Sequence, residues 1–213
     1  KGIKFSQKAL ELSPNFIDAY LILAKSQIEG NSYKNALKTV SKCLDFDHRN
    51  QELLKLFRDI LIHNSFTEYD LDLDKKIELL FDDNKFEQIF PNLLSRIEKH
   101  PTMSTLLSQI DNIISTEDII RVVEKLVKIP FFVEILSSGL NSSIKIEKLL
   151  TVLRKGILYN KDNLCNNKNI ILFHTCLTIQ CFNNEFVFAQ TDEEYNIIKK
   201  LEKDLEIKAE ENQ

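Results

Sequence analysis

The fold of this chain is decided by residues 17–48, which run IDAYLILAKSQIEGNSYKNALKTVSKCLDFDH. Tyr20, Leu23 and Ala24 recur at three- and four-residue spacings, and this spacing predicts a helix with one apolar face. Residues 29–31, Glu-Gly-Asn, predict a turn. A second helix is predicted by a further set of apolar and small residues at helical spacing: Ala36, Val40, Cys43 and Leu44. Residues 17–48 therefore predict a helical hairpin.

The pattern of this hairpin recurs at an interval of 34 residues. Residues at the start of the chain align with residues of the second helix, Gly2, Ser6, Ala9, Leu10 and Pro14 with Ala36, Val40, Cys43, Leu44 and His48. Small residues keep their positions in both copies. Residues 1–12 are thus expected to form a second helix whose first helix is missing. Because the first residue is also not Met, we expect the start of the protein to have been cut away.

The residues of this unit resemble the tetratricopeptide repeat, whose length is 34 residues. Gln27 stands where the family usually has an aromatic residue, and His48 stands where it usually has proline. The resemblance implies stacked hairpins whose first helices line a concave groove for a protein or peptide partner. It places four residues on that groove: Asp18, Leu21, Lys25 and Ile28.

The repeat is predicted to end near residue 63. Residues 50–62 predict another first helix, but Arg58 occupies its small-residue position. We expect a guanidinium there to prevent close packing, so this helix would terminate the array. The chain then divides into a repeat region, residues 1–63, and a second helical region, residues 64–213.

The second region keeps helical spacing but loses the repeat. Ser115 with the acids after it predicts one helix start, and Thr191 with Glu194 predicts the start of a last helix. Residues 160–169 are expected to form a polar loop, and residues 170–182, apolar almost all round, a buried central helix. Residues 186–188 alternate like a strand but are too few for a sheet. The predicted fold class is all-α, with tetratricopeptide-type hairpins followed by an irregular, α-solenoid-like helical array.

A second resemblance covers roughly the last third of the chain. It rests on LLTVLR at residues 149–154, LTI at 177–179, QCFNNEFVF at 180–188 and TDEE at 191–194. This order is similar to the N-terminal helical region of bacterial proteins in which tetratricopeptide repeats precede a class I S-adenosylmethionine-dependent methyltransferase domain. The resemblance implies that such a domain follows residue 213 and uses S-adenosylmethionine.

The methyl donor site itself is not expected in these 213 residues. Binding the donor on a methyltransferase fold needs a strand that ends in a glycine-rich turn. The four glycines, at positions 2, 30, 139 and 156, are neither grouped nor placed after a strand. No catalytic or cofactor-binding residue is therefore predicted, and no nucleophile, base and orienting acid assemble at a suitable spacing.

Two clusters near the end of the apolar helix are candidate sites. The first is a polar cluster of Gln180, Asn183, Asn184 and Glu185, which would either organise a turn at the helix end or contact a neighbouring domain. The second is His174 with cysteines at 165, 176 and 181. His174 and Cys181 share a helix face, but Cys176 points elsewhere, so no zinc site is predicted.

The composition limits the classes of partner that the chain is expected to bind. The net charge is −4 with acids and bases interspersed, which disfavours nucleic acid. The apolar stretches are shorter than the roughly 20 residues of a membrane span, so no membrane contact is expected. Irregularly spaced cysteines and the lack of a secretion signal favour the cytoplasm.

The predicted function is a non-catalytic interaction or scaffolding region at the N-terminal side of a methyltransferase. One alternative is a complete, free-standing tetratricopeptide adaptor. Another is a methyltransferase whose activity resides C-terminal to residue 213. The sequence that follows residue 213 would separate these hypotheses.

Overall fold

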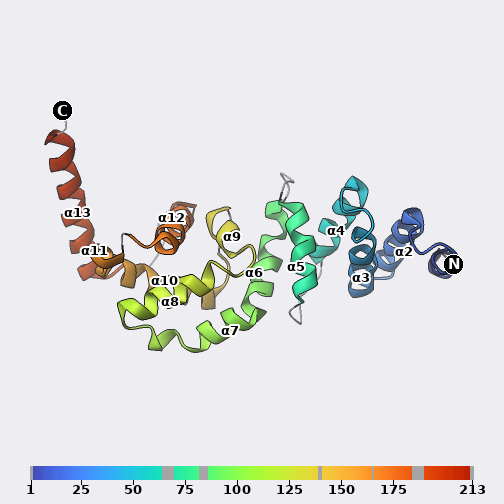
Figure 1. Cartoon of the computed structure of the whole chain (residues 1–213), viewed down its shortest axis with the longest axis horizontal. Coiled ribbons are helices and arrows are strands. Elements are labelled where there is room, and N and C mark those ends of the chain that lie inside the picture. The colour runs from blue at the N-terminus through green and yellow to red at the C-terminus, as the bar shows by residue number, and fades with distance from the viewer. Residues whose placement is uncertain are drawn as a thin grey trace. The chain divides into compact units, whose positions relative to one another are not determined.

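A computed structural model of the chain describes residues 2–63, 70–81, 86–138, 141–164, 166–183 and 190–211. Every regular element in this part of the chain is a helix, as predicted (Figure 1). The chain divides into two compact units, Lys1–Lys99 and His100–Gln213, called unit 1 and unit 2 below. The boundary predicted at residue 63 lies inside unit 1.

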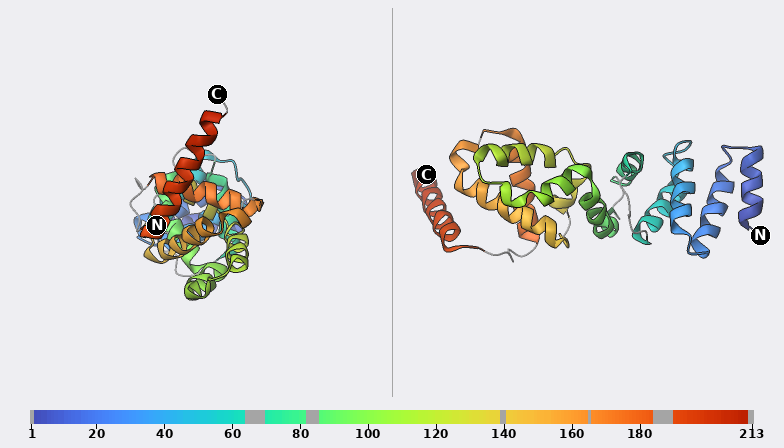
Figure 2. Two further views of the ribbon diagram at one scale, coloured as in Figure 1. Left: turned by 90° about the vertical axis from the view of Figure 1, so that its left-hand side faces the viewer. Right: turned by 90° about the horizontal axis from the view of Figure 1, so that it is seen from below.

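Unit 1 begins with four helices that pack in chain order, each on the next (Figure 2, right). They are followed by shorter elements. The helices of unit 1 are α1 (Gly2–Leu12), α2 (Ile17–Glu29), α3 (Tyr33–Leu44), α4 (Gln51–His63), α5 (Leu71–Ile77), the 3-10 helices η1 (Glu78–Leu80) and η2 (Phe86–Ile89), and α6 (Phe90–Lys99).

The hairpin predicted from residues 17–48 is present as α2 and α3. Asn31 takes a positive φ of 53° in the turn between them, a conformation that asparagine adopts more readily than most residues. Ala24 and Ala36 are completely buried between the helices. On the other side of α2, a Cβ at Gly2 would lie 2.8 Å from Ser26 Oγ, so α1 also approaches closely. Small residues at these positions therefore set the spacing of the first three helices.

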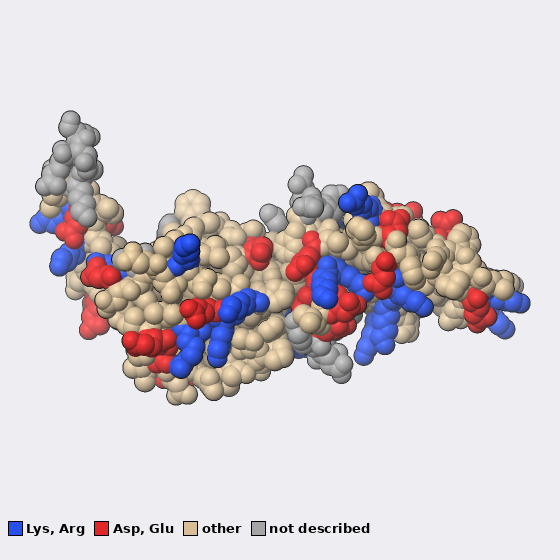
Figure 3. Space-filling view, viewed as in Figure 1, with Lys and Arg blue, Asp and Glu red and all other residues tan. Residues whose placement is uncertain are grey.

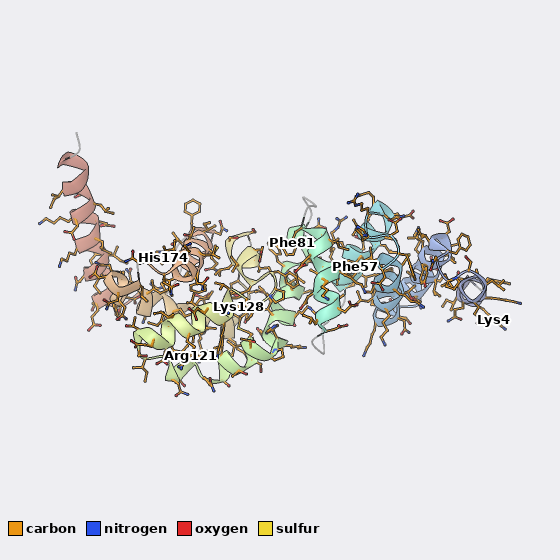
Figure 4. The ribbon with its side chains drawn as sticks, viewed as in Figure 1. Lys4, Phe57, Phe81, Arg121, Lys128 and His174 are labelled. Atoms are coloured by element: carbon orange, nitrogen blue, oxygen red, sulfur yellow. The ribbon has the colours of Figure 1, made fainter. Side chains whose placement is uncertain are left out.

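The expectation that Arg58 prevents close packing is wrong. The Arg58 side chain is buried in α4 beside the core residue Phe57, which Figure 4 labels. The same helix packs on η1 and η2, and Asn92 of α6 donates hydrogen bonds of 2.7 Å to the carbonyls of Leu61 and Ile62. Packing thus continues past α4, because the guanidinium is accommodated within the unit.

A buried ion pair joins α5 to α6. Arg96 Nε donates to Asp74 Oδ1 at 2.6 Å, and both side chains are almost fully buried. Arg96 also donates to the carbonyl of Asp70, which caps α5. Lys76 of α5 bridges Asp45 at 3.1 Å and Asp72 at 2.7 Å. Side-chain charges therefore take a large part in fixing α5 in unit 1.

Unit 2 contains eight elements in its described residues. They are α7 (Pro101–Ser108), η3 (Ile110–Asn112), α8 (Thr116–Leu126), α9 (Phe132–Ser138), α10 (Ile144–Tyr159), α11 (Lys161–Leu164), α12 (Lys168–Asn183) and α13 (Asp192–Glu211). The main contacts join α12 to α8, α9 and α10, and α10 to α7, α8 and α13.

Both predicted helix starts in this unit are confirmed by cap hydrogen bonds. The Asp118 backbone donates to Ser115 Oγ at 3.1 Å, and the Ser115 backbone donates back to Asp118 Oδ2 at 3.1 Å. Thr191 and Glu194 exchange the same pair of bonds at the start of α13, at 2.9 and 3.3 Å. These reciprocal bonds satisfy amides that the first helical turn leaves without partners.

Gly156 lies where α10 closely approaches α8. A Cβ at this position would lie 2.5 Å from Ile119 Cδ1. A side chain on α10 here would therefore displace Ile119, and glycine allows the two helices to touch.

Two expectations for this unit are wrong. Residues 160–169 are not a simple loop, because they hold α11 and the first two residues of α12. The helix predicted as buried all round, α12, is buried on one side only, through Ile170, Phe173, Cys176, Leu177 and Gln180. Its opposite side is exposed, since α8, α9 and α10 all pack on the same face. The strand-like residues 186–188 lie outside the described part of the chain.

Candidate functional site

The residues predicted to line a groove on α2 do not share one environment. Leu21 is buried, Ile28 is half-buried, and Asp18 and Lys25 are exposed. Lys25 Nζ lies 2.6 Å from Glu52 Oε1 of α4, so its charge is already paired within unit 1. The exposed stripe of α2 is instead Asp18, Ile22, Lys25 and Glu29. The surface of α2 and α4 is therefore a mixed, partly ion-paired face.

A groove in unit 2 is a second candidate site. It lies between α7 with η3 on one side and the first turns of α10 on the other, with a volume of about 680 Å³. Apolar side chains contribute from both sides: Leu107, Ile110, Ile144 and Val152. Charged and amide side chains stand beside them: Asp111, Asn141, Lys145, Glu147 and Lys148. A pocket of this size that mixes apolar surface with a few polar groups is typical of a ligand site.

Local hydrogen bonds hold the α10 side of the groove in place. The Ser143 backbone donates to Asn141 Oδ1 at 3.0 Å, and Asn141 Nδ2 donates to Glu147 Oε2 at 3.0 Å. Ser143 Oγ accepts from the Ile146 backbone at 3.2 Å and so caps α10. These bonds fix the segment before α10, while Ile144 directly after the cap remains 81% exposed.

Sequence reasoning did not find this groove, although one signal was present. The inward positions of α10 are 146, 149, 150, 153 and 157. Ile144 is apolar but out of phase with that series. An apolar residue at an outward position of a capped helix could have indicated a contact surface there.

The predicted polar cluster at the end of α12 is not brought together among its described members. Gln180 is buried, and its Nε2 has no hydrogen-bond acceptor in the described residues. Asn183 is exposed, and its Nδ2 donates to the Ser137 carbonyl of α9 at 3.4 Å. Asn184 and Glu185 lie outside the described residues. Gln180 and Asn183 therefore face different surroundings.

The described histidine and cysteines of α12 do not form a ligand set. Across the described residues, no three His, Cys, Asp or Glu side chains gather into a possible metal site. Burial lowers the pKa of His174 from its ordinary value and raises the pKa of the Cys176 and Cys181 thiols. These shifts favour neutral groups, as expected for thiols and an imidazole near a protein core. Cys165 lies outside the described residues.

One buried acid fixes the start of α13. Glu194 is fully buried, and its Oε1 lies 2.8 Å from Arg154 Nη1 of α10, with Lys155 Nζ at 3.6 Å from Oε2. Burial favours the neutral carboxyl, but hydrogen bonds from Thr191 and the Arg154 charge outweigh it and hold the Glu194 pKa below its usual value. Farther along α13, Leu205 and Ile207 are exposed. The described contacts of α13 are thus concentrated near its first turns.

Replacing Glu194 by Ala is expected to release α13 from α10. The change removes charge-assisted hydrogen bonds worth about 2 kcal/mol, so amide exchange in residues 197–205 should quicken about 30-fold. Hydrogen exchange with mass spectrometry measures this. Glu193→Ala is the control, because Glu193 is exposed and, among the described residues, accepts one long hydrogen bond, from the Tyr159 hydroxyl at 3.4 Å. Equal exchange in both variants would show that Glu194 does not hold α13 on α10.

The contact of α13 with α10 should also weaken in acid. A carboxyl whose folded-state pKa is lowered stabilises the folded state at pH values above its unfolded pKa. That contribution is lost as pH falls through the lowered folded pKa. The protection of α13 amides in the unmodified protein, measured against the intrinsic exchange rate at each pH, should therefore decrease below about pH 4, where the Glu194→Ala variant has less protection left to lose.

Within the described residues, no helix is both long and apolar enough to cross a membrane. Comparison of the chain with protein families, with curated proteins and with solved structures finds no match in any of the three.

Proposed function

We propose that this chain is a helical protein-interaction region that binds a peptide segment of a partner in the groove of unit 2. The main support for this proposal is the lining of that groove. It offers apolar contacts from α7, η3 and α10, together with both positive and negative charges. A peptide presents the same mixture of apolar and charged side chains. Hydrogen bonds already order the segment before α10 in the unbound chain, and this lowers the entropic cost of association.

A peptide library displayed on phage, selected on the purified chain, tests this proposal. Enriched peptides should bind the Ile144→Glu variant at least about tenfold more weakly, because burying an isoleucine contributes about 1.5–3 kcal/mol. The variant should fold normally, since Ile144 is 81% exposed and an acid suits the first turn of α10.

Ile114→Glu is the matched control for this experiment. Ile114 is 83% exposed, also flanks a helix start in unit 2, and does not line the groove. Its substitution should leave peptide affinity within about twofold. Failure to enrich any peptide, or equal affinity for both variants, would show that the groove is not a peptide site.

We also propose that these helices belong to a tetratricopeptide-plus-methyltransferase protein. The 34-residue period and the signature within residues 149–195 support this proposal. S-adenosylmethionine would then bind a longer protein and not this chain, which calorimetric titration of both would measure. The rival hypothesis of a free-standing adaptor predicts instead that the coding sequence ends directly after residue 213.

A further inference from the structure

The exposed side of α12 is an uncharged apolar surface. Its large side chains are exposed by 50% at Ile171, 47% at Leu172, 40% at Ile179 and 68% at Phe182. Thr175 and Thr178 lie exposed between them. The sequence has no Asp, Glu, Lys or Arg between Lys168 and Glu185. His174, which Figure 4 marks on this helix, is exposed at the edge of this surface, and partial desolvation lowers its pKa from the ordinary value.

The central stripe of this surface is symmetric under reversal of the helix. It consists of Ile171, Thr175, Thr178 and Phe182, with spacings of four, three and four residues. Laid antiparallel on a second copy, Ile171 meets Phe182 and Thr175 meets Thr178. On one flank, Leu172 then lies beside Ile179 of the second copy. An isologous two-fold contact requires this kind of self-complementary surface.

The two threonines are suited to the centre of such a contact. Thr175 Oγ1 donates to the Ile171 carbonyl, and Thr178 Oγ1 donates to the His174 carbonyl, each at 2.8 Å. Because both hydroxyls already have an acceptor in their own helix, covering them leaves no donor unsatisfied. Their small size allows two helix backbones to approach closely.

Charge distinguishes α12 from other exposed helix faces of unit 2. Arg121 and Lys125 of α8, with Lys128 just after that helix, are exposed, and Arg121 pairs with Asp118; blue side chains lie over this part of the molecule in Figure 3. Two copies joined through α8 would bring like charges together. The α12 surface carries no such penalty, so self-association is favoured there.

We propose that the chain forms a homodimer through antiparallel pairing of α12 with α12 of a second copy. The helix has 16 residues and is about 24 Å long, so the contact belongs to the small end of stable interfaces. Association is therefore expected in the micromolar range and should depend on concentration. The inference concerns a surface separate from the groove, and it holds whether or not the groove binds a peptide.

Sedimentation velocity over a concentration series tests the dimer. Thr178→Arg should weaken association at least about a hundredfold, because it puts two cations close together at the two-fold centre. Thr105→Arg on α7 is the matched control. Thr105 is exposed on a helix of the same unit, and its hydroxyl donates to a carbonyl four residues back, at 2.9 Å. The control should dimerise like the unmodified chain.

A mixing experiment tests whether the threonine stripe itself forms the contact. One variant carries Thr175→Lys with Thr178→Lys, and another carries Thr175→Glu with Thr178→Glu. Each should be monomeric alone, and an equimolar mixture should form a one-to-one heterodimer, measured by native mass spectrometry. Recovery on mixing also shows that both variants are folded.

Three results would overturn the proposal. These are a monomeric unmodified chain at several hundred micromolar, equal dimerisation of Thr178→Arg and Thr105→Arg, or no heterodimer on mixing. A monomer whose α12 amides are strongly protected from exchange would assign this surface to a contact within the chain.

Discussion

Replacing Ala24 by Arg should destabilise unit 1 by about 3 kcal/mol or more. Ala24 is completely buried where α2 packs against its neighbours, so a long side chain must push the helices apart. It would also bury a charge, which adds a desolvation cost. Thermal and denaturant unfolding, followed by circular dichroism, should show a markedly lower midpoint.

Ile22→Arg provides the comparison on the same helix. Ile22 is two residues away but exposed, so the same side chain should change stability by less than about 0.5 kcal/mol. Similar midpoints for the two variants would remove Ala24 from the helix contact. They would also remove the 34-residue alignment that places small residues at such contacts.

Removing the carboxylate of Asp74 should cost about 3–5 kcal/mol. The Asp74→Ala change leaves the buried Arg96 guanidinium without the acid that lies 2.6 Å from its Nε. The loss should appear as a lower unfolding midpoint and as faster amide exchange in α5, which this pair fixes to α6. Replacing both partners, as Asp74→Leu with Arg96→Met, should be much less costly, because no buried charge remains.

The exposed pair Lys25 with Glu52 is the control for this comparison. Its N–O distance is also 2.6 Å, yet both side chains are more than half exposed. Lys25→Ala should therefore cost below about 1 kcal/mol. Equal losses at Asp74 and Lys25 would show that burial does not set the strength of these ion pairs.

Helix positions in this chain were largely predictable, because local chemistry determines them. Ser115 with Asp118 and Thr191 with Glu194 start helices through bonds within four residues. The apolar spacing of residues 17–48 likewise needs no distant information. These features can be predicted from the sequence because the interacting groups are close together along the chain.

Burial of a whole helix was less predictable. The composition of α12 resembles that of a fully buried helix, but its partners cover one face only. Arg58 is charged and yet buried. Both outcomes depend on which distant helices pack nearby, and periodicity carries no information about that.

The groove of unit 2 was missed for the same reason. It exists because η3 and the start of α10, more than 30 residues apart in sequence, lie side by side. On α2, the residues predicted to line a groove do not form one exposed surface, because Leu21 is buried. The position of Leu21 inside the core is set by packing on α1 and α3.

Because α1 to α4 pack in chain order, the helices of unit 1 are not equally stabilised. Among its main contacts, α1 touches α2 alone, and its Phe5 and Leu12 remain exposed, whereas α2 and α3 are each clamped between two helices. In a stack with nearest-neighbour coupling, an end helix can fray while the rest stays cooperative. In the 213-residue chain, α1 should therefore unfold before the α2–α3 hairpin, and a protease added to this chain should cut α1 first.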